Sequence, residues 1–477
     1  MNDTEPDNLT PSGAPAAAAA AAQAPIRRGL VFAIVALALI MMSINSTIVA
    51  TALSALQHGL NTSINWAGWT ITAYAVGFVL MLPVSGKLSE RYGHYKVFLV
   101  SIIAFTVASL LCGLVNDIYA LIALRALQAV GGAGFTPSAT GIIVKHFGDQ
   151  RDRAVGLFGS IFPIGSMLGP IFGGLFVEYW SWRGIFFVNV PIGIVVAFLV
   201  MRYVPRDVPE RALARARMDL LGIALLGTGL LAGMLTTSYL AETSVHTLSF
   251  VLPVGIALSI GSLWAFFRHI NRTDEPAIPP RLIYGGGFGQ VNFVNLLYGG
   301  LTSGSIALAP LYAINRYHMS ALNSGTLLIA QGLAAILFSV AAAFALRRTG
   351  YRPPLYVGGS IIAFGIVLLA LKPMFGIAPY EWLAGSAFLI GVGSGTINPA
   401  TRNAGLQLAP ERSSTLAALR SMFMATGAIV TISVATAILA AASDPGGAQA
   451  AIYVAAAVLL IAALPVITRV PEHHGSW

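Results

Sequence analysis

Residues 29–53 read GLVFAIVALALIMMSINSTIVATAL, a run without a single charged side chain. A helix of about 20 apolar residues is long enough to cross a hydrocarbon core about 30 Å thick. The rest of the chain is similar, because 56% of its 477 residues are hydrophobic and only 9% are charged. Backbone polar groups in lipid must be paired within the spanning segment, so such runs favour helices. The sequence therefore predicts an all-α polytopic membrane protein.

Fourteen apolar runs predict fourteen transmembrane helices, grouped as six, two and six. The longest internal polar connections, 205–218 and 268–287, flank the seventh and eighth runs. This grouping predicts two related six-helix halves about a central cavity, at 29–204 and 289–470, with two extra helices within 205–288 and cytoplasmic tails at 1–28 (disordered) and 471–477. The runs lie at 29–53, 67–86, 97–115, 118–143, 155–178, 184–204, 219–239, 248–268, 289–312, 323–346, 354–372, 382–408, 415–440 and 449–469.

The net charge of +9 is unevenly distributed between alternate gaps. Most Lys and Arg residues lie on one side of the predicted membrane, and the other side has only Arg183, Arg316 and Lys372. Basic residues gather on the cytoplasmic side of membrane proteins. The sequence therefore predicts a multi-pass protein of the inner (plasma) membrane with both termini in the cytoplasm, and the positive charge does not indicate a nucleic-acid partner.

Signatures of enzymes and cofactors are missing from the sequence. The single cysteine, Cys112, excludes an internal disulfide and a cysteine metal cluster. We find no His/Glu metal spacing and no phosphate-binding Gly-rich loop followed by Lys-Ser/Thr. We therefore expect no cofactor, no metal and no enzyme activity.

None of the fourteen runs carries an aspartate or glutamate in its middle. An intramembrane carboxylate is the usual proton-binding group of a transporter. The nearest equivalent is Asn45, a neutral amide midway along the first run. A carboxamide accepts and donates hydrogen bonds, but it cannot exchange a proton or pair with a cation.

The gap between the second and third runs, residues 86–96, reads GKLSERYGHYK. It resembles the signature loop of the major facilitator superfamily, G-x-L-a-D-r-x-G-r-r/k, with Glu90 at the usual aspartate. Gly86 permits close helix contact, and Gly93 permits a tight turn. An acid beside bases such as Arg91 can latch the cytoplasmic face; the alternative is a solvated run of charges.

Two further runs resemble elements of the same superfamily. Arg125 and Gln128 lie in the fourth run, where a charge is costly unless it faces protein or water. We therefore expect Arg125 to face the bundle interior, in a structural or a coupling role. The fifth run resembles the family's antiporter motif, G-x-x-x-G-P-x-x-G-G, which implies export by exchange and a flexible helix, with tight packing as the alternative. Its residues are Gly165, Gly169, Pro170, Gly173 and Gly174.

Residues 180–193, WSWRGIFFVNVPIG, resemble the fourteen-span drug:proton antiporter branch of this superfamily. That branch carries an aspartate in the first run, where this chain has Asn45. The resemblance implies proton-coupled export, and Asn45 removes the acid that would serve it. If coupling persists, it must use Glu90, Glu178 or Asp219, or the substrate's own proton.

The twelfth run supplies polar groups at Asn398 and Arg402. Arg402 either faces the cavity and favours anionic or hydroxyl-rich substrates, or extends to the membrane interface. Arg420 lies nearer the cytoplasm, and we expect it to reach the interface or to pair. The candidate substrate-binding or coupling residues are Asn45, Tyr74, Arg125, Gln128, Asn398 and Arg402.

The expected function is secondary efflux of amphipathic small molecules or drugs by alternating access. The alternatives are an exchanger or facilitator for an anionic or polar metabolite, and a non-transporting membrane receptor. The expected partners are a small-molecule substrate and the lipid bilayer. The sequence leaves open whether protons and a periplasmic adaptor are partners as well.

Overall fold

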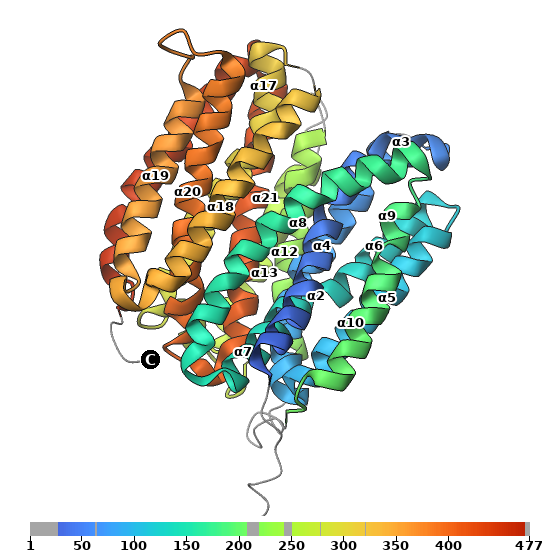
Figure 1. The fold of residues 1–477 in the computed structure, drawn as a ribbon, viewed down its shortest axis with the longest axis vertical. Helices are drawn as coiled ribbons and strands as arrows, with labels where there is room; N and C mark the ends of the chain where they lie inside the picture. The colour runs from blue at the N-terminus through green and yellow to red at the C-terminus, as the bar shows by residue number, and fades with distance from the viewer. Residues whose placement is uncertain are drawn as a thin grey trace, which may run out of the picture.

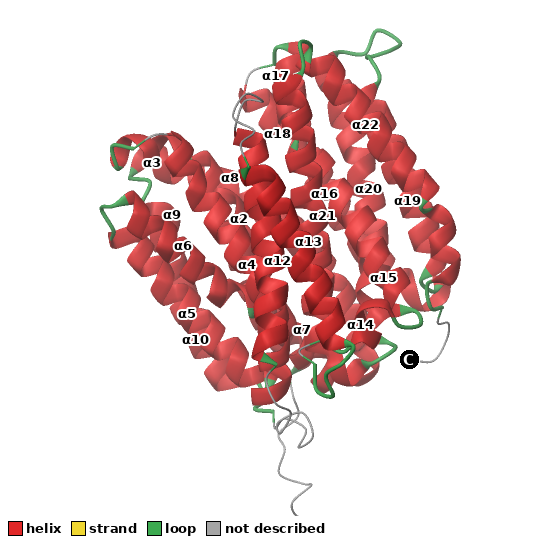
Figure 2. Cartoon of the chain, turned by 180° about the vertical axis from the view of Figure 1, so that it is seen from behind, coloured by secondary structure: helices red, strands yellow, loops and turns green. Residues whose placement is uncertain are grey.

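The computed structural model describes residues 27–62, 64–207, 219–242, 250–276, 278–319 and 321–472. Within these residues the regular secondary structure consists of helices and turns, as Figure 2 shows. Nearly all of the predicted tails, 1–26 and 473–477, and most of the connection 205–218 lie outside the described residues.

The helices up to Tyr203 pack into one bundle. α2 lies along α8, and α6 packs between α4 and α5. In Figure 1 this bundle is the blue-to-green group on one side of the molecule. Its helices are α2 (Arg28–Thr51), α3 (Leu53–Gly59), α4 (Ile64–Tyr92), α5 (His94–Leu114), α6 (Ile118–Ala133), α7 (Phe135–His146), α8 (Arg151–Tyr179), α9 (Gly184–Phe187) and α10 (Asn189–Tyr203).

The chain from Pro280 onward forms a second bundle, shown in yellow to red in Figure 1. Its centre is α20, which packs against α18 and α19, while α22 packs on α19. A π-helical turn, η3, interrupts its first long segment. The elements are α14 (Pro280–Tyr284), α15 (Phe288–Val294), η3 (Asn295–Gly299), α16 (Gly300–Ala307), α17 (Ala309–Tyr317), α18 (Ala321–Thr349), α19 (Arg352–Ala370), α20 (Pro379–Leu406), α21 (Ser413–Ala441) and α22 (Pro445–Ala462).

Two helices lie between these bundles in sequence and cover the seam between them in space. α12 (Leu220–Glu242) and α13 (Val251–Ile270) pack as a pair, and α12 also contacts α4 and α21. They run across the middle of the view in Figure 2. Because α4 and α21 also pack directly on each other, the pair covers a seam that is already closed.

Eleven helices of the described residues are long and apolar enough to cross a membrane, or twelve if the bent segment from Phe288 to Tyr317 is one span. The fourteen predicted crossings therefore exceed what length and hydropathy select. The apolar part of α12 is short, at Leu220–Thr236. α20 is long, but it carries Ser394, Asn398 and Thr401 toward a cavity, which lowers its mean hydropathy.

Three predicted spans are broken helices. The fourth divides at Gly134 into α6 and α7, where the glycine lies against the Ser101 side chain. The sixth divides into α9 and α10. The ninth bends by 41° between α16 and α17, beside Pro310, which cannot donate a backbone hydrogen bond.

The outward face of the first bundle is apolar. Along α5, large hydrophobic side chains are exposed while the opposite face of the helix is buried. An apolar outer surface suits a lipid environment, because lipid tails replace the protein core as the apolar partner. The exposed residues of α5 are Val100, Ile103, Val107, Leu110, Leu111 and Leu114.

Candidate functional site

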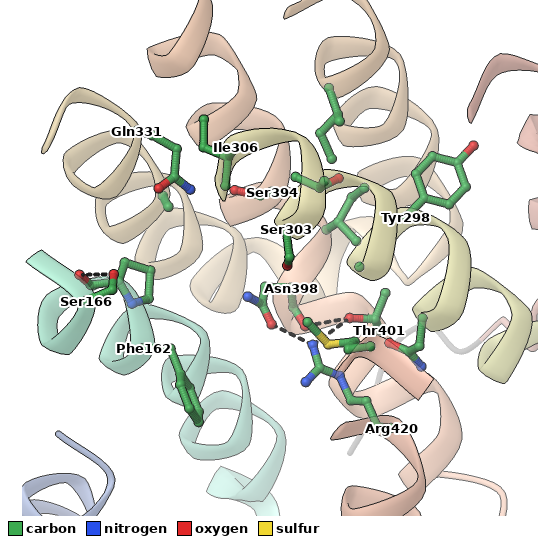
Figure 3. A pocket seen from close by; sticks show the side chains of 18 of the residues that line it. Phe162, Ser166, Tyr298, Ser303, Ile306, Gln331, Ser394, Asn398, Thr401 and Arg420 are labelled. Carbon is green, nitrogen blue, oxygen red and sulfur yellow. Dashed lines mark hydrogen bonds between the residues drawn. The ribbon is translucent and has the colours of Figure 1, made fainter. Parts of the chain in front are cut away.

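A cavity of about 260 Å³ lies between the two bundles (Figure 3). α2 and α8 line it from the first bundle, and η3, α16, α18, α19, α20 and α21 line it from the second. Its wall mixes hydroxyl and amide groups with apolar side chains. The polar residues are Ser43, Ser46, Ser166, Asn295, Tyr298, Thr302, Ser303, Gln331, Ser394, Asn398, Thr401 and Arg420.

Arg420 of α21 is the charged residue of this wall. Its Nη2 donates to Asn398 Oδ1 at 2.8 Å and to Thr401 Oγ1 at 3.3 Å, both on α20. Figure 3 shows this guanidinium group at the end of the cavity. Of the two alternatives expected for Arg420, reaching the interface is wrong, because its side chain turns inward and its residue exposure is only 8%. The residue pairs instead with neutral groups of α20.

Arg402 lies directly beside this site. Its Nε donates to the same Asn398 Oδ1 at 3.1 Å, and its guanidinium lies 5.7 Å from the centre of the Phe162 ring. The residue is buried, with 8% exposure, and it lines a small pocket next to the main cavity together with Thr401 and Arg420. Its side chain therefore stays inside the protein rather than reaching a membrane interface.

The other four predicted site residues form a separate buried network in the first bundle. Asn45 Oδ1 accepts from Arg125 Nη1 at 3.4 Å, from Gln128 Nε2 at 3.2 Å and from Asn189 Nδ2 at 3.5 Å. Tyr74 stacks its ring against the Arg125 guanidinium, 4.3 Å from ring centre to Cζ. None of these side chains lines the central cavity.

Arg125 faces the bundle interior, as the sequence predicts. It is 1% exposed, and it also donates to Thr70 O and to Gln128 Oε1. The ion pairs found among the described residues do not include it. A neutral amide, Asn45, thus occupies the place beside Arg125 where a carboxylate would form an ion pair.

Hydrogen bonds join the two bundles at the end where α4 stops and α21 begins, and we call this group the latch. Glu90 Oε1 accepts from the Thr415 backbone N–H at 2.9 Å, and its Oε2 accepts from Arg412 Nη1 at 3.3 Å. Gly86 allows this approach, since a methyl group there would lie 2.9 Å from Ala418 Cβ. The latch lies at the lower end of the molecule in Figure 1.

A second contact lies beside the latch, and the sequence did not single it out. Asp152, at the start of α8, accepts from Gln407 Nε2 at 3.0 Å through Oδ1, and its backbone carbonyl accepts from Asn403 Nδ2 at 2.9 Å.

Gly93 makes the turn between α4 and α5 with φ of +97°. The remaining loop residue, Arg91, stacks over Tyr92 and does not join the latch.

The glycines of the antiporter-like motif are in α8, an unbroken helix. Gly165, Gly169 and Gly173 face α2, where an added methyl group would overlap Ser43, Thr47 and Thr51 respectively. Gly174 has no neighbour that such a methyl would meet. Pro170 lies in the same helix, but its side chain is outside the described ones. The motif thus gives close packing within one bundle, and its flexing role stays a prediction.

Two bundles of long apolar helices around a polar cavity, joined at one end, are typical of membrane transporters. The family model of the Major Facilitator Superfamily matches residues 35–415 and 291–476. The chain belongs to this superfamily.

Relatives within the superfamily include resistance proteins. The chain is 30% identical to the Multidrug resistance protein B homolog of Mycobacterium tuberculosis over 345 residues, which are 72% of this chain and 62% of that protein. It is 28% identical to the Tetracenomycin C resistance and export protein of Streptomyces glaucescens, over 79% of this chain and 70% of that one. The chain therefore spans less than two thirds of the length of the Mycobacterium tuberculosis protein.

A solved structure gives the same fold. The crystal structure of the human organic anion transporter MFSD10 superimposes with a TM-score of 0.64, covering 93% of this chain and all of that one. The identity of 16% is low, so this likeness concerns the fold alone.

Proposed function

We propose that this protein is a secondary efflux transporter that moves amphipathic small molecules through the central cavity by alternating access. The observation that carries the proposal is the cavity itself. It lies between two bundles that are joined at one end by the latch. Breaking the latch and re-forming contacts at the other end would expose the same site to the other side of the membrane.

The chemistry of the cavity supports an amphipathic substrate. Ser, Thr, Asn and Gln side chains supply hydrogen bonds, while Phe162, Ile306 and Met424 supply apolar surface. Ligand sites of this kind combine an apolar wall with a few polar groups that fix orientation. The resistance and export relatives are a second support for efflux.

Proton exchange, in our proposal, does not occur at residue 45. The Asn45 amide lies outside the cavity, and it cannot take up a proton. Three buried carboxylates remain at the joined end, Glu90, Asp152 and Asp207. Any of these acids, or a proton carried by the substrate, could drive antiport; an exchanger or facilitator needs none of them.

The topology belongs to the same proposal. We place α12 and α20 across the membrane with the other helices, which gives fourteen crossings with both termini in the cytoplasm. The division into halves at 29–204 and 289–470 is retained. Under this arrangement the latch closes the cytoplasmic side, so that the structure represents the outward-facing half of the cycle.

The test fills the cavity. Ser303→Trp places a large ring in the cavity, and Val107→Trp on the exposed face of α5 is the matched control. Cells that produce each variant are compared for accumulation of, and resistance to, a panel of amphipathic dyes and drugs, with and without an uncoupler. We expect lowered accumulation of some compounds with wild type and the control, and loss of that effect with Ser303→Trp.

Two outcomes would contradict the proposal. The first is equal accumulation of every compound in producing and non-producing cells, together with no counterflow in proteoliposomes. The second is full efflux by Ser303→Trp. Ligand binding without any flux would favour the receptor alternative.

A further inference from the structure

The central cavity has a charge that its function as a general drug pathway does not explain. Arg420 and Arg402 lie side by side, since both donate to the Oδ1 atom of Asn398. Both residues are buried, each with 8% exposure. Neither belongs to an ion pair among the described residues, and no aspartate or glutamate lines the cavity there.

An arrangement of this kind is unfavourable without a partner. Removing a charged group from water costs several kcal/mol, and proteins normally recover this by placing an opposite charge nearby. Here two guanidinium groups share one neutral oxygen, that of Asn398. Their mutual repulsion adds to the cost. An incoming anion would relieve both.

The hydrogen-bonding capacity of Arg420 is also incomplete. Its Nη2 makes both of the bonds to α20, to Asn398 and Thr401. Its buried Nε has no hydrogen-bond partner among the described residues. A guanidinium group presents several N–H donors in a planar fork that matches the two oxygens of a carboxylate or sulfonate. Arg420 therefore retains donors for such a group.

We propose that the substrate of this transporter is an amphipathic organic anion, whose carboxylate or sulfonate pairs with Arg420 while its apolar body lies against Phe162, Ile306 and Met424. Arg402 is a positioning residue, which acts through Asn398 and adds positive potential. This assignment rests on the proposed transport function and narrows its substrate class.

The experiment compares three molecules that share one aromatic body and differ in charge. 1-Naphthoate is the anion, 1-naphthylmethylammonium the cation and 1-naphthamide the neutral control. Binding to the full-length protein in lipid nanodiscs is measured by calorimetry. We expect naphthoate to bind at least about 10-fold more tightly than the ammonium compound, since only the anion can form a charge-assisted hydrogen bond with the guanidinium group of Arg420.

Variants then locate the charge. Arg420→Gln should weaken naphthoate binding by about 10- to 100-fold and leave naphthamide within about twofold. Arg420→Lys should retain part of the anion preference, because the charge stays while the fork is lost. Arg281→Gln, at an exposed arginine of α14, should change nothing. Thermal melting of each variant shows that it is folded, and Arg420→Lys keeps the test valid if Arg420→Gln does not fold.

The outcomes separate this inference from the transport proposal. Equal affinity for the three molecules, no naphthoate binding, or an anion preference that survives in Arg420→Gln overturns the anion site. Counterflow in proteoliposomes tests transport independently. Movement of naphthamide without anion preference leaves transport standing and removes the anion assignment, whereas Arg420-dependent naphthoate binding without counterflow does the reverse.

Discussion

Replacing Asn45 by aspartate tests how the buried Arg125 is stabilised. In the wild type, Arg125 Nη1 lies 3.4 Å from Asn45 Oδ1. At that distance a full negative charge would attract the guanidinium by about 5 kcal/mol at an effective dielectric constant of 20. Burying the new carboxylate costs several kcal/mol, whereas the cost of burying the Arg125 charge is already present in the wild type. The two contributions nearly cancel, so we expect Asn45→Asp to unfold at close to the wild-type temperature.

Asn45→Leu is the matched variant, because it has a similar size and no acceptor. It removes the Arg125 hydrogen bond and leaves Gln128 and Asn189 without this partner. Loss of a hydrogen bond to a charged group costs about 1.5–3 kcal/mol. The assay reports the opening of the first bundle, a unit of about 150–250 residues in which each kcal/mol shifts the melting temperature by about 2–4 °C, so we expect a value about 3–12 °C below wild type.

The assay uses the one cysteine of the chain. Cys112 is fully buried in α5, so a thiol-reactive fluorophore reports when this bundle opens on heating. Arg125→Gln combined with Asn45→Asp is the control, since it leaves the carboxylate unpaired and should lose about 3–5 kcal/mol. If Asn45→Asp melts as low as Asn45→Leu, or if the double variant is as stable as Asn45→Asp alone, the reasoning about Arg125 fails.

Four further variants test the latch, the helix packing and the hydrogen bonds of Arg183. Glu90→Gln weakens a charge-assisted contact across the latch. The end of the molecule opposite the latch should then close more often, so the distances between spin labels on α3 and α17 should become shorter. An unchanged distance distribution would contradict the role of the latch. Gly169→Val should destabilise the protein by about 2 kcal/mol or more in the same thermal assay, because the new valine side chain meets Thr47. Gly174→Val is the control and should lose under about 1 kcal/mol, because no neighbour lies there. Equal losses would contradict this account of the packing. Arg183→Ala removes three hydrogen bonds to the end of α5 and the turn that follows it. The free energy of unfolding should fall by about 2–3 kcal/mol. A loss under about 0.5 kcal/mol would show that these hydrogen bonds do not stabilise the fold.

Much of the fold could be predicted from hydropathy. Long apolar runs without charges, such as residues 29–53, permit little except a helix in lipid. The predicted runs coincide with helices at most positions, and the interior position of Arg125 follows from the cost of charge in lipid. The break at Gly134 could not be predicted, because it depends on the close contact with Ser101 of another helix. Pro310 was a signal for the bend at Leu308, which the prediction of one continuous ninth run did not use.

The site was less accessible to prediction than the fold. A polar residue within an apolar run shows that the group must be paired, but not whether it faces a neighbouring helix or a cavity. Asn45 and Arg125 are hydrogen-bonded to each other inside one bundle, whereas Asn398 and Arg420 are hydrogen-bonded at the wall of the cavity. The charge of Arg420 within an apolar run was the available signal for a site residue. Its position near the start of that run was wrongly interpreted as proximity to the membrane interface.

The sequence by itself determined that this chain spans a membrane many times, that the charges well inside its apolar runs are arginines, and that residue 45 cannot exchange a proton. These properties belong to single side chains and to the length of each run. The tertiary structure decided which polar groups meet. Asn45 joins Arg125 away from the cavity, Arg420 turns toward Asn398, and Glu90 reaches Thr415 across the seam. Such contacts join residues tens to hundreds of positions apart, and they form only when the helices pack, either within one bundle or across the seam between the two.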